Sequence, residues 1–492
     1  MTDMALTITN LWVRDRQGNA LVKGVSLAVP RNGVLTLIGE TGSGKSLIAQ
    51  AVFGLLSPEL AASGTITIAG HRPIEAGNPR ALARLWREQI MLIPQEPSLA
   101  LDPTMKVRRQ MALAGLADAA INPALSAFDL PASTGQSFPF ALSGGMAQRV
   151  LIATALGVGA PVIIADEPTK GLDTDRVTQT IDALRQLAGA GRTLLVITHE
   201  RRVAEELPGE LAIIRDGAII ERGESVHILE APESDYARIW LDADPRHWPR
   251  CHRCCDMERL TLSAHGLSFG WPQQPPLFEN LDLHLPKGGV LAVSGPSGSG
   301  KSTLGDVLLG LRRPRMGSVE WGGIDIVASS AAIRPLRQRY QKLHQDPIKA
   351  FLPHLALMRQ FKALEAVKPG LSVARDLPPL LDRLRVKPSL LNRLPGEISG
   401  GEAQRLALAR ILLLDPFAII ADEPTSRLDP VVQRETMLLL RELVDENGLG
   451  LVLISHDLAL LRSLADETID LSDHRPRSPA QLKGATASTT LS

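Results

Sequence analysis

The sequence contains few aromatic residues and no excess of charge of either sign. Phe, Trp and Tyr make up 3% of the 492 residues, too few for the aromatic platforms on which proteins stack the bases of single-stranded nucleic acid. Lys and Arg together number 53, and Asp and Glu also number 53. A formal net charge of zero argues against a protein that wraps nucleic acid over a large area. We therefore expect no nucleic-acid partner.

Cysteines and long apolar runs are also scarce. Three cysteines cannot form a disulfide framework, which favours a reducing cytosol. No apolar run approaches the roughly 18 residues needed to cross a bilayer, and the first four residues lack the basic and apolar regions of a signal peptide. A chain of 492 residues is too long for one ordinary core. We therefore predict a cytoplasmic protein with at least two domains.

A glycine-rich phosphate-binding motif, G-x-x-x-x-G-K-S, occurs twice. Each copy follows an apolar segment typical of a buried strand and precedes a segment typical of a helix, as a P-loop requires. Glycines allow backbone N–H groups to turn toward phosphate oxygens, and a helix N-terminus adds partial positive charge. The motif residues are Gly39, Glu40, Thr41, Gly42, Ser43, Gly44, Lys45 and Ser46 in the first copy, and Gly295, Pro296, Ser297, Gly298, Ser299, Gly300, Lys301 and Ser302, followed by Thr303, in the second.

The landmarks of the two copies are spaced at a constant interval. Lys45 and Lys301 are 256 residues apart, as are Asp166 and Asp422. This spacing predicts a duplicated domain, with a first domain at 1–235, a linker at 236–258 and a second domain at 259–475. The tail at 476–492 is rich in Ser, Thr and Ala, so we expect it to be disordered.

Two further apolar strands in each copy end in chemically active side chains. Aspartate after a buried strand, together with the P-loop hydroxyl, is a typical Mg²⁺ site of a nucleotide-phosphate enzyme. The glutamate that follows could orient or deprotonate a water molecule, a glutamine could bind both water and Mg²⁺, and a histidine could contact the γ-phosphate. The predicted metal ligands are Ser46, Gln95 and Asp166 in the first copy and Ser302, Gln345 and Asp422 in the second. The predicted catalytic residues are Gln95, Glu167 and His199 in the first copy and Gln345, Glu423 and His456 in the second.

Two glycine-rich helix starts complete the pattern, Leu142-Ser143-Gly144-Gly145 and Ile398-Ser399-Gly400-Gly401. With the motifs above, they resemble the ATP-binding cassette (ABC) ATPases along nearly the whole chain. The resemblance implies an α/β fold with two tandem P-loop NTPase domains, each a RecA-like α/β core with an antiparallel β subdomain and a helical subdomain. It also implies that ATP and Mg²⁺ bind, and that the two halves pair within one chain. Ser399, Gly400 and Gly401 would then close the first site, and Ser143, Gly144 and Gly145 the second.

A narrower resemblance is to the ATPases of dipeptide, oligopeptide and nickel importers. The residues 95–103, Q-E-P-S-L-A-L-D-P, are similar to that group's Q-[DE]-P-x-x-S-L-N-P stretch, and residues 393–401 resemble its approach to the glycine-rich helix start. The resemblance implies an ATP-hydrolysing importer subunit for a peptide, nickel or a related small solute. Its partners would be two integral membrane permease subunits and an extracytoplasmic solute-binding protein. It would lie peripherally on the cytoplasmic face of the inner membrane.

Other classes of tandem ATPase fit less well. A soluble cassette factor that binds ribosomes should have a long charged linker and a basic balance, whereas this linker is short and contains prolines. Cassettes that act on DNA carry zinc modules or coiled-coil insertions, which the constant spacing of the copies leaves no room for. A fused sugar-importer ATPase usually has one damaged site, and here both sites keep their Lys, Gln, Asp, Glu and His.

The two halves differ in one expected adenine contact. In the resembled family an aromatic residue about two dozen positions before the P-loop stacks on adenine, and Trp271 has this spacing in the second half. The first half has Asp15 there, with Trp12 offset. We predict weaker stacking in the first site, by roughly 1 kcal/mol; the alternative is that another residue covers the base.

A cysteine cluster lies in the predicted linker. Relatives of the resembled group can carry an iron–sulfur cluster in such a region, and Cys251, His252, Cys254 and Cys255 are the candidate ligands. Adjacent cysteines ligate one cluster poorly, and a fourth thiolate is missing. We therefore expect free thiols and no iron–sulfur cluster.

Overall fold

The structure is a computed structural model of the chain, and it describes residues 3–170, 174–249, 259–296, 298–327, 330–425 and 428–474. Ser297, the cysteine cluster at 251–255 and the predicted tail lie outside the described residues. The chain divides into two compact units, the first built mainly from Met1–Asp244 and the second from Pro245–Leu428 and Val432–Ser492.

The first unit contains an antiparallel sheet of four strands in the order β2-β1-β4-β5. Its longest pair, β1 with β2, buries alternate apolar residues such as Leu6 and Ile8, the pattern of a sheet with one covered face. The strands are β1 (Met4–Arg14), β2 (Ala20–Pro30), β4 (Ala61–Ile68) and β5 (Ile74–Glu75).

The core sheet of the first unit has six strands in the order β10-β9-β3-β8-β7-β6. All neighbours are parallel except the antiparallel pair β9 and β10. Every residue of β3, β7 and β8 is buried, as expected for parallel strands covered on both faces. The strands are β3 (Val34–Gly39), β6 (Ile90–Ile93), β7 (Val162–Asp166), β8 (Thr193–Thr198), β9 (Glu210–Arg215) and β10 (Ala218–Glu224).

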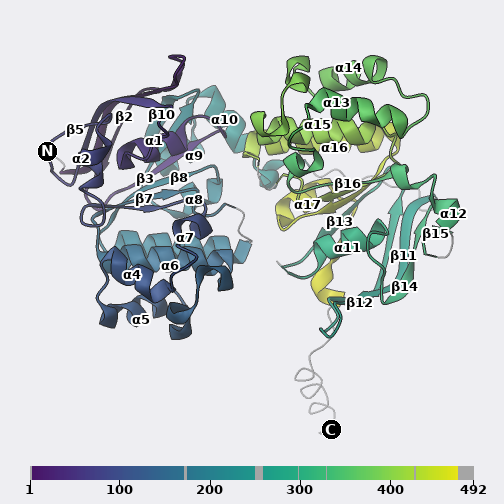
Figure 1. Cartoon of the computed structure of the whole chain (residues 1–492), viewed down its shortest axis with the longest axis horizontal. Coiled ribbons are helices and arrows are strands. Elements are labelled where there is room, and N and C mark those ends of the chain that lie inside the picture. Colours follow the sequence, from purple (N-terminus) through teal and green to yellow (C-terminus); the bar gives the residue numbers. More distant parts are fainter. Residues whose placement is uncertain are drawn as a thin grey trace, which may run out of the picture. The chain divides into compact units, whose positions relative to one another are not determined.

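Helices surround the core sheet and build a separate helical part. Within the first unit, Figure 1 shows α4, α5 and α6 at one end, β2 and β5 at the other, and β3, β7 and β8 between them. The helices are α1 (Lys45–Phe53), α2 (Pro79–Ala83), α3 (Pro97–Ala100), α4 (Val107–Ala114), α5 (Asp118–Ser126), α6 (Gly144–Val158), α7 (Thr174–Gly189), α8 (Arg201–Glu206), α9 (Ser225–Glu230) and α10 (Asp235–Asp242).

The second unit repeats this plan. Its antiparallel sheet has the order β12-β11-β14-β15, and its core sheet has the order β16-β17-β18-β13-β19 with parallel neighbours throughout. The strands are β11 (Leu260–Phe269), β12 (Phe278–Pro286), β13 (Val290–Ser294), β14 (Met316–Trp321), β15 (Ile324–Asp325), β16 (Tyr340–Leu343), β17 (Ala418–Asp422), β18 (Gly450–Ile454) and β19 (Glu467–Asp470). The helices are α11 (Lys301–Leu308), α12 (Ser330–Ile333), α13 (Leu357–Lys362), α14 (Val373–Arg383), α15 (Gly400–Leu412), α16 (Pro430–Asn447) and α17 (Leu458–Leu464).

Both units therefore have the predicted architecture, an α/β core with an antiparallel β part and a helical part. The segment predicted as a linker differs from a plain extended connection in its described residues. Trp240 of α10 is 2% exposed and packs with Ile38 and Ile213 of the first unit, whereas Trp248 is 6% exposed and packs in the core of the second. The described part of the linker is folded because these tryptophans are buried.

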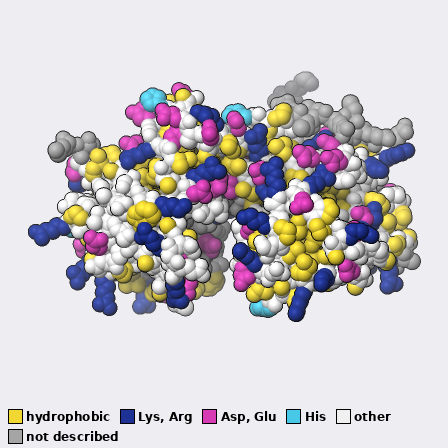
Figure 2. Space-filling model, turned by 90° about the horizontal axis from the view of Figure 1, so that it is seen from above, with side chains coloured by type: hydrophobic (Ala, Val, Ile, Leu, Met, Phe, Trp, Pro, Cys, Tyr) yellow, Lys and Arg dark blue, Asp and Glu magenta, His cyan; other side chains and the backbone are white. Residues whose placement is uncertain are grey.

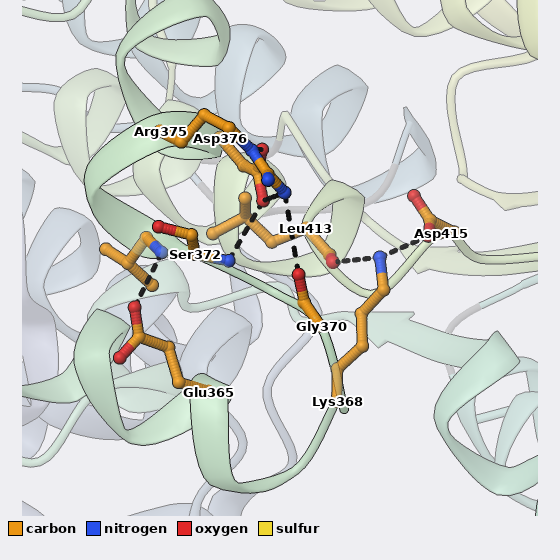
Figure 3. Close-up of polar contacts among 9 residues, drawn as sticks. Glu365, Lys368, Gly370, Ser372, Arg375, Asp376, Leu413 and Asp415 are labelled. Carbon is orange, nitrogen blue, oxygen red and sulfur yellow. Dashed lines mark hydrogen bonds and ion pairs between the residues drawn. The ribbon is translucent and has the colours of Figure 1, made fainter.

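Polar contacts fix the helical part of the second unit (Figure 3). The backbone N–H of Val373, the first residue of α14, donates a hydrogen bond of 2.7 Å to Glu365. Lys368 donates to the carbonyl of Leu413, at the end of α15, at 3.0 Å and pairs with Asp415. These contacts tie the segment between α13 and α14 to the helix that begins with the glycine-rich motif.

Candidate functional site

Each P-loop connects a buried core strand to a helix, as the sequence predicts. β3 leads into α1 in the first unit, and β13 leads into α11 in the second. The residue before α1 is Gly44, with φ +97°, and a Cβ there would lie 3.0 Å from the carbonyl oxygen of Leu21. Glycine is required at this position because other residues rarely adopt positive φ. Thr303 lies in the first turn of α11.

Buried polar atoms in both P-loops fit a phosphate ligand. The hydroxyls of Ser43 and Ser299 are buried and have no hydrogen-bond partner among the described residues. Lys45 donates to the carbonyls of Gly39 and Glu40 at 2.6 and 2.8 Å. Burial lowers the pKa of Lys45, although nearby carboxylates oppose this effect. Since unpaired buried donors are costly, the hydroxyls of Ser43 and Ser299 suit contact with phosphate oxygens. Lys301 makes the same contacts with the carbonyls of Gly295 and Pro296.

The predicted metal ligands meet in each unit. Ser46 donates a hydrogen bond of 3.1 Å to Asp166, and Ser302 donates one of 2.9 Å to Asp422. Burial raises the pKa of Asp166 to about 6, against the hydrogen bond from Ser46. Mg²⁺ binds protein through one or two carboxylates and substrate phosphates and keeps several waters. This all-oxygen donor set fits Mg²⁺ held together with a nucleotide.

Gln95 and Gln345 lie at the same edge of their sheets as these ligands. Gln95 follows β6, which pairs with β7, and Gln345 follows β16, which pairs with β17. Because parallel strands end at one sheet edge, each glutamine lies on the side where Asp166 or Asp422 ends its strand. Within the described residues, the structure contains no group of three or more His, Cys, Asp or Glu that could hold a metal by itself.

A glutamate and a histidine form a pair in each unit. Nδ1 of His199 lies 2.7 Å from Glu167, and Nδ1 of His456 lies 2.9 Å from the nearer carboxylate oxygen of Glu423. Both glutamates have left-handed backbones, with φ +49° and +47°, which costs about 1–2 kcal/mol per non-glycine residue. Such strain clusters at functional sites, and here it is repeated in both units.

In the first unit, the histidine keeps the glutamate in the carboxylate form. Burial opposes ionisation of Glu167, but the hydrogen bond and charge of His199 outweigh it and hold the pKa of Glu167 below its usual value. Burial also lowers the pKa of His199, and the contact with Glu167 more than reverses this. The hydrogen bond with Glu423 raises the pKa of His456. The first pair thus presents an ionised carboxylate, the form that can accept a proton.

The glycine-rich motifs begin helices, as predicted. Ser143 is the N-cap of α6 and accepts a hydrogen bond of 3.3 Å from the backbone N–H of Met146. Ser399 is the N-cap of α15 and accepts one of 3.3 Å from Glu402, whose side chain accepts from the backbone N–H of Ser399 at 2.8 Å. The helix starts at Gly144, Gly145, Gly400 and Gly401 offer N–H groups that suit an anion.

The predicted adenine contact, Trp271, is 37% exposed in the structure. The guanidinium carbon of Arg312 lies 4.8 Å from its ring centroid, and Phe269 contacts it edge-on. A base that stacks on this face of Trp271 would have to replace the arginine. In the first unit Arg14 covers Trp12 in the same way, at 4.5 Å.

Sequence reasoning missed one charged residue beside the second site. Nζ of Lys342, in β16, lies 2.8 Å from Asp306 and 3.3 Å from Asp422. The available signal was a lysine in a short strand beside the apolar β17, where the matching strand of the first copy has Leu92.

Comparisons with known proteins identify the family of the chain. The family model described as "ABC transporter" matches residues 22–170 and 278–426. The chain is 32% identical over 501 residues to an uncharacterized ABC transporter ATP-binding protein, YejF, of Escherichia coli, covering 96% of this chain and 94% of that protein. It is 31% identical to the peptidoglycan transport ATP-binding protein YejF of Agrobacterium fabrum, covering 95% and 91%. It is also 31% identical to the glutathione import ATP-binding protein GsiA of Salmonella typhi, covering 90% and 80%.

A solved structure shares the fold. The archaeal ribosome recycling factor aABCE1, in complex with the stalk protein aP1, superposes with a TM-score of 0.64 over 93% of this chain and 87% of that one. At 20% sequence identity this likeness concerns the fold alone. The family model covers more than half of the chain, and the relatives are similar over nearly its whole length. The chain therefore belongs to the ABC transporter family, as a tandem ATP-binding subunit whose ATP hydrolysis is coupled to transport.

Proposed function

We propose that this chain energises an importer for a peptide or a peptide-derived small solute. The observation that carries the proposal is that both units keep a complete set of P-loop lysine, hydroxyl–aspartate pair and glutamate–histidine pair. Two relatives with 31% identity are named for peptidoglycan transport and glutathione import, which favours a peptide-like solute. Nickel stays an expectation from the motif resemblance, because none of the three relatives above is named for it.

The residues of each unit divide the work of ATP hydrolysis. Lys45 and the P-loop N–H groups would bind the β- and γ-phosphates in the first unit. Mg²⁺ would be held by Ser46, Asp166 and Gln95, and it supplies positive charge that offsets the charge of the phosphates. Glu167 accepts a proton from the water that attacks the γ-phosphorus, and its pair with His199 fixes the carboxylate. The equivalent set of the second unit is Lys301, Ser302, Asp422, Gln345, Glu423 and His456.

We also propose that the two halves pair within the chain. The helix start at Ser399 would close the first ATP site, and the helix start at Ser143 would close the second. Closure around two ATP molecules and reopening after hydrolysis would provide the motion that drives transport. The proposal divides the chain into a first domain at 1–235 and a second domain at 259–475. Helix α10 begins the segment between them and packs on the first domain.

The partners in this proposal are two integral membrane permeases and an extracytoplasmic solute-binding protein. Among the described residues, no helix has the length and apolar content to span a bilayer. We place the chain peripherally on the cytoplasmic face of the inner membrane.

The helical parts carry exposed apolar side chains suited to contact with the permeases, such as Phe140 at 77% and Leu352 at 64%. Figure 2 shows hydrophobic side chains gathered on the face of the second unit that includes α13 and α14. We expect no nucleic-acid partner.

An affinity pull-down from the native membranes tests this proposal. A tagged Glu167→Gln/Glu423→Gln chain should hydrolyse ATP about 10²–10⁴-fold more slowly and accumulate the ATP-bound state. Recovery of two integral membrane proteins with this variant is the expected result. A matched Lys45→Ala/Lys301→Ala chain, which lacks the phosphate-binding ammonium groups, is the control. Recovery of ribosomes or DNA without a membrane partner would overturn the proposal.

A further inference from the structure

The second nucleotide site contains a half-buried ammonium group beside its candidate metal ligand. Nζ of Lys342 lies 2.8 Å from Oδ1 of Asp306 and 3.3 Å from Oδ2 of Asp422. The side chains of Lys342, Asp306 and Asp422 are 14%, 21% and 9% exposed. The other oxygen of Asp422 accepts the hydrogen bond from Ser302. Lys342 therefore contacts Asp422 on the side that Ser302 leaves open.

The first site contains neither member of this charged pair. Strand pairing places Leu92 opposite Ile164, two residues before Asp166, and Lys342 opposite Ile420, two residues before Asp422. Leu92 thus occupies in the first unit the position of Lys342. The position of Asp306, five residues after the P-loop lysine, is held by Gln50 in the first unit. The two sites share the metal ligands but differ in the charge beside them.

A cation beside Asp422 weakens the binding of a second cation to the same carboxylate. Like charges a few ångströms apart repel more strongly in a partly buried site than in water, because the effective dielectric constant is lower. Asp306 restrains Lys342, so the ammonium group cannot simply move into solvent, and Arg312 in turn pairs with Asp306 at 3.1 Å.

We propose that Lys342 is a positioning residue of the second nucleotide site that orients Asp422 and weakens divalent-cation binding there relative to the first site. The inference rests on the proposed function, because it takes Asp422 as a metal ligand. The presence of Lys342 makes the two sites of one chain unequal in their affinity for Mg²⁺, although their P-loops and glutamate–histidine pairs match. The first site would fill with metal–nucleotide at lower Mg²⁺ concentrations than the second.

Electron paramagnetic resonance of Mn²⁺, titrated into the full chain with ADP, measures the two sites separately. A Lys45→Ala background leaves the second site to bind nucleotide, and a Lys301→Ala background leaves the first. We expect Lys342→Met to lower the Mn²⁺ dissociation constant at least fivefold in the Lys45→Ala background. In the Lys301→Ala background the same substitution should leave the constant unchanged, which controls for general effects on the fold.

A second variant separates the charge effect from structural damage. Asp306→Asn leaves Lys342 with Asp422 as its carboxylate partner, so the Mn²⁺ dissociation constant of the second site should rise, opposite to the effect of Lys342→Met. Lys342→Gln should shift the constant in the same direction as Lys342→Met. An unchanged or weaker affinity in Lys342→Met, or equal shifts in Lys342→Met and Asp306→Asn, would overturn the inference while leaving the proposed function intact. If no Mn²⁺ binds with ADP in the Lys45→Ala chain that keeps Lys342, the proposed metal site itself is wrong.

Discussion

Replacing Asp166 with asparagine is expected to stabilise the first unit when neither nucleotide nor metal is bound. Burial raises the pKa of this carboxyl from 3.8 to about 6, so the folded protein holds at neutral pH a charge that its surroundings disfavour. The difference corresponds to about 3 kcal/mol, at roughly 1.4 kcal/mol per pKa unit. The side chain is 8% exposed, so solvent screening reduces this value little. Asparagine removes the charge and keeps an oxygen to accept the hydrogen bond from Ser46.

The expected pH dependence follows from the direction of the shift. Because the folded pKa lies above the unfolded one, the protein loses stability as the pH rises from about 4 to about 6. The gain from Asp166→Asn should therefore be largest above pH 6 and vanish near pH 4. Urea unfolding of the full chain in EDTA, with hydrogen exchange of the peptide containing β7, reports on the first unit separately.

Asp422→Asn is the matched control in the second unit. Asp422 pairs with Lys342 at 3.3 Å, so its removal takes an ionic partner from a half-buried ammonium group. We expect Asp422→Asn to lower the free energy of unfolding by about 1 kcal/mol or more, whereas Asp166→Asn raises it. A destabilised Asp166→Asn chain at pH 7.5, or a gain that persists at pH 4, would refute the reasoning about buried charge.

Three further predictions concern the phosphate site and the helical part of the second unit. Ser43→Ala removes a buried hydroxyl that lacks a partner among the described residues, so calorimetry should show ATP affinity at least about tenfold lower, with unchanged stability of the nucleotide-free chain; equal affinity would exclude a phosphate contact. Phe361→Ala should lower the free energy of unfolding by about 3–5 kcal/mol, because this side chain is fully buried. Limited proteolysis should then cut the chain between α13 and α14, and a chain that resists cleavage would contradict the packing. The pKa of Asp376 is lowered to about 2 by its hydrogen bond with Arg375, so the stability advantage over Asp376→Asn should be present above pH 4 and shrink as the pH falls toward 2 in acid titrations of unfolding; a constant advantage would argue against the pair.

Local sequence patterns sufficed for the elements that carry the site. The P-loop glycines, the apolar strands and the serine caps each act over a few residues, because they reflect backbone conformation, strand burial and helix capping. The structure accordingly places β3 and α1 around the first P-loop and begins α6 directly after Ser143. The duplicated spacing extended the same prediction to the second unit.

Other features could not be read from local patterns. The described residues of the predicted linker are folded because Trp240 and Trp248 are buried. Their burial depends on residues that are distant in the sequence. Trp271 stays the predicted adenine contact, but its contact with Arg312, 41 residues away in the sequence, could not be predicted from the residues around it. The residues around Lys342 indicate no site, and only the pairing of β16 with β17 brings this lysine beside Asp422.

The sequence by itself determined which side chains are present at the sites: two P-loops, two strand-end carboxylate pairs, two strand-end histidines among the eleven of the chain, and two capped glycine-rich helices. Only the tertiary structure decided which of them meet. In the core sheet β8 lies between β3 and β7, an order that differs from the order in the chain. Because parallel strands end at a common edge, this order brings His199 to Glu167 and Ser46 to Asp166, which are 120 residues apart.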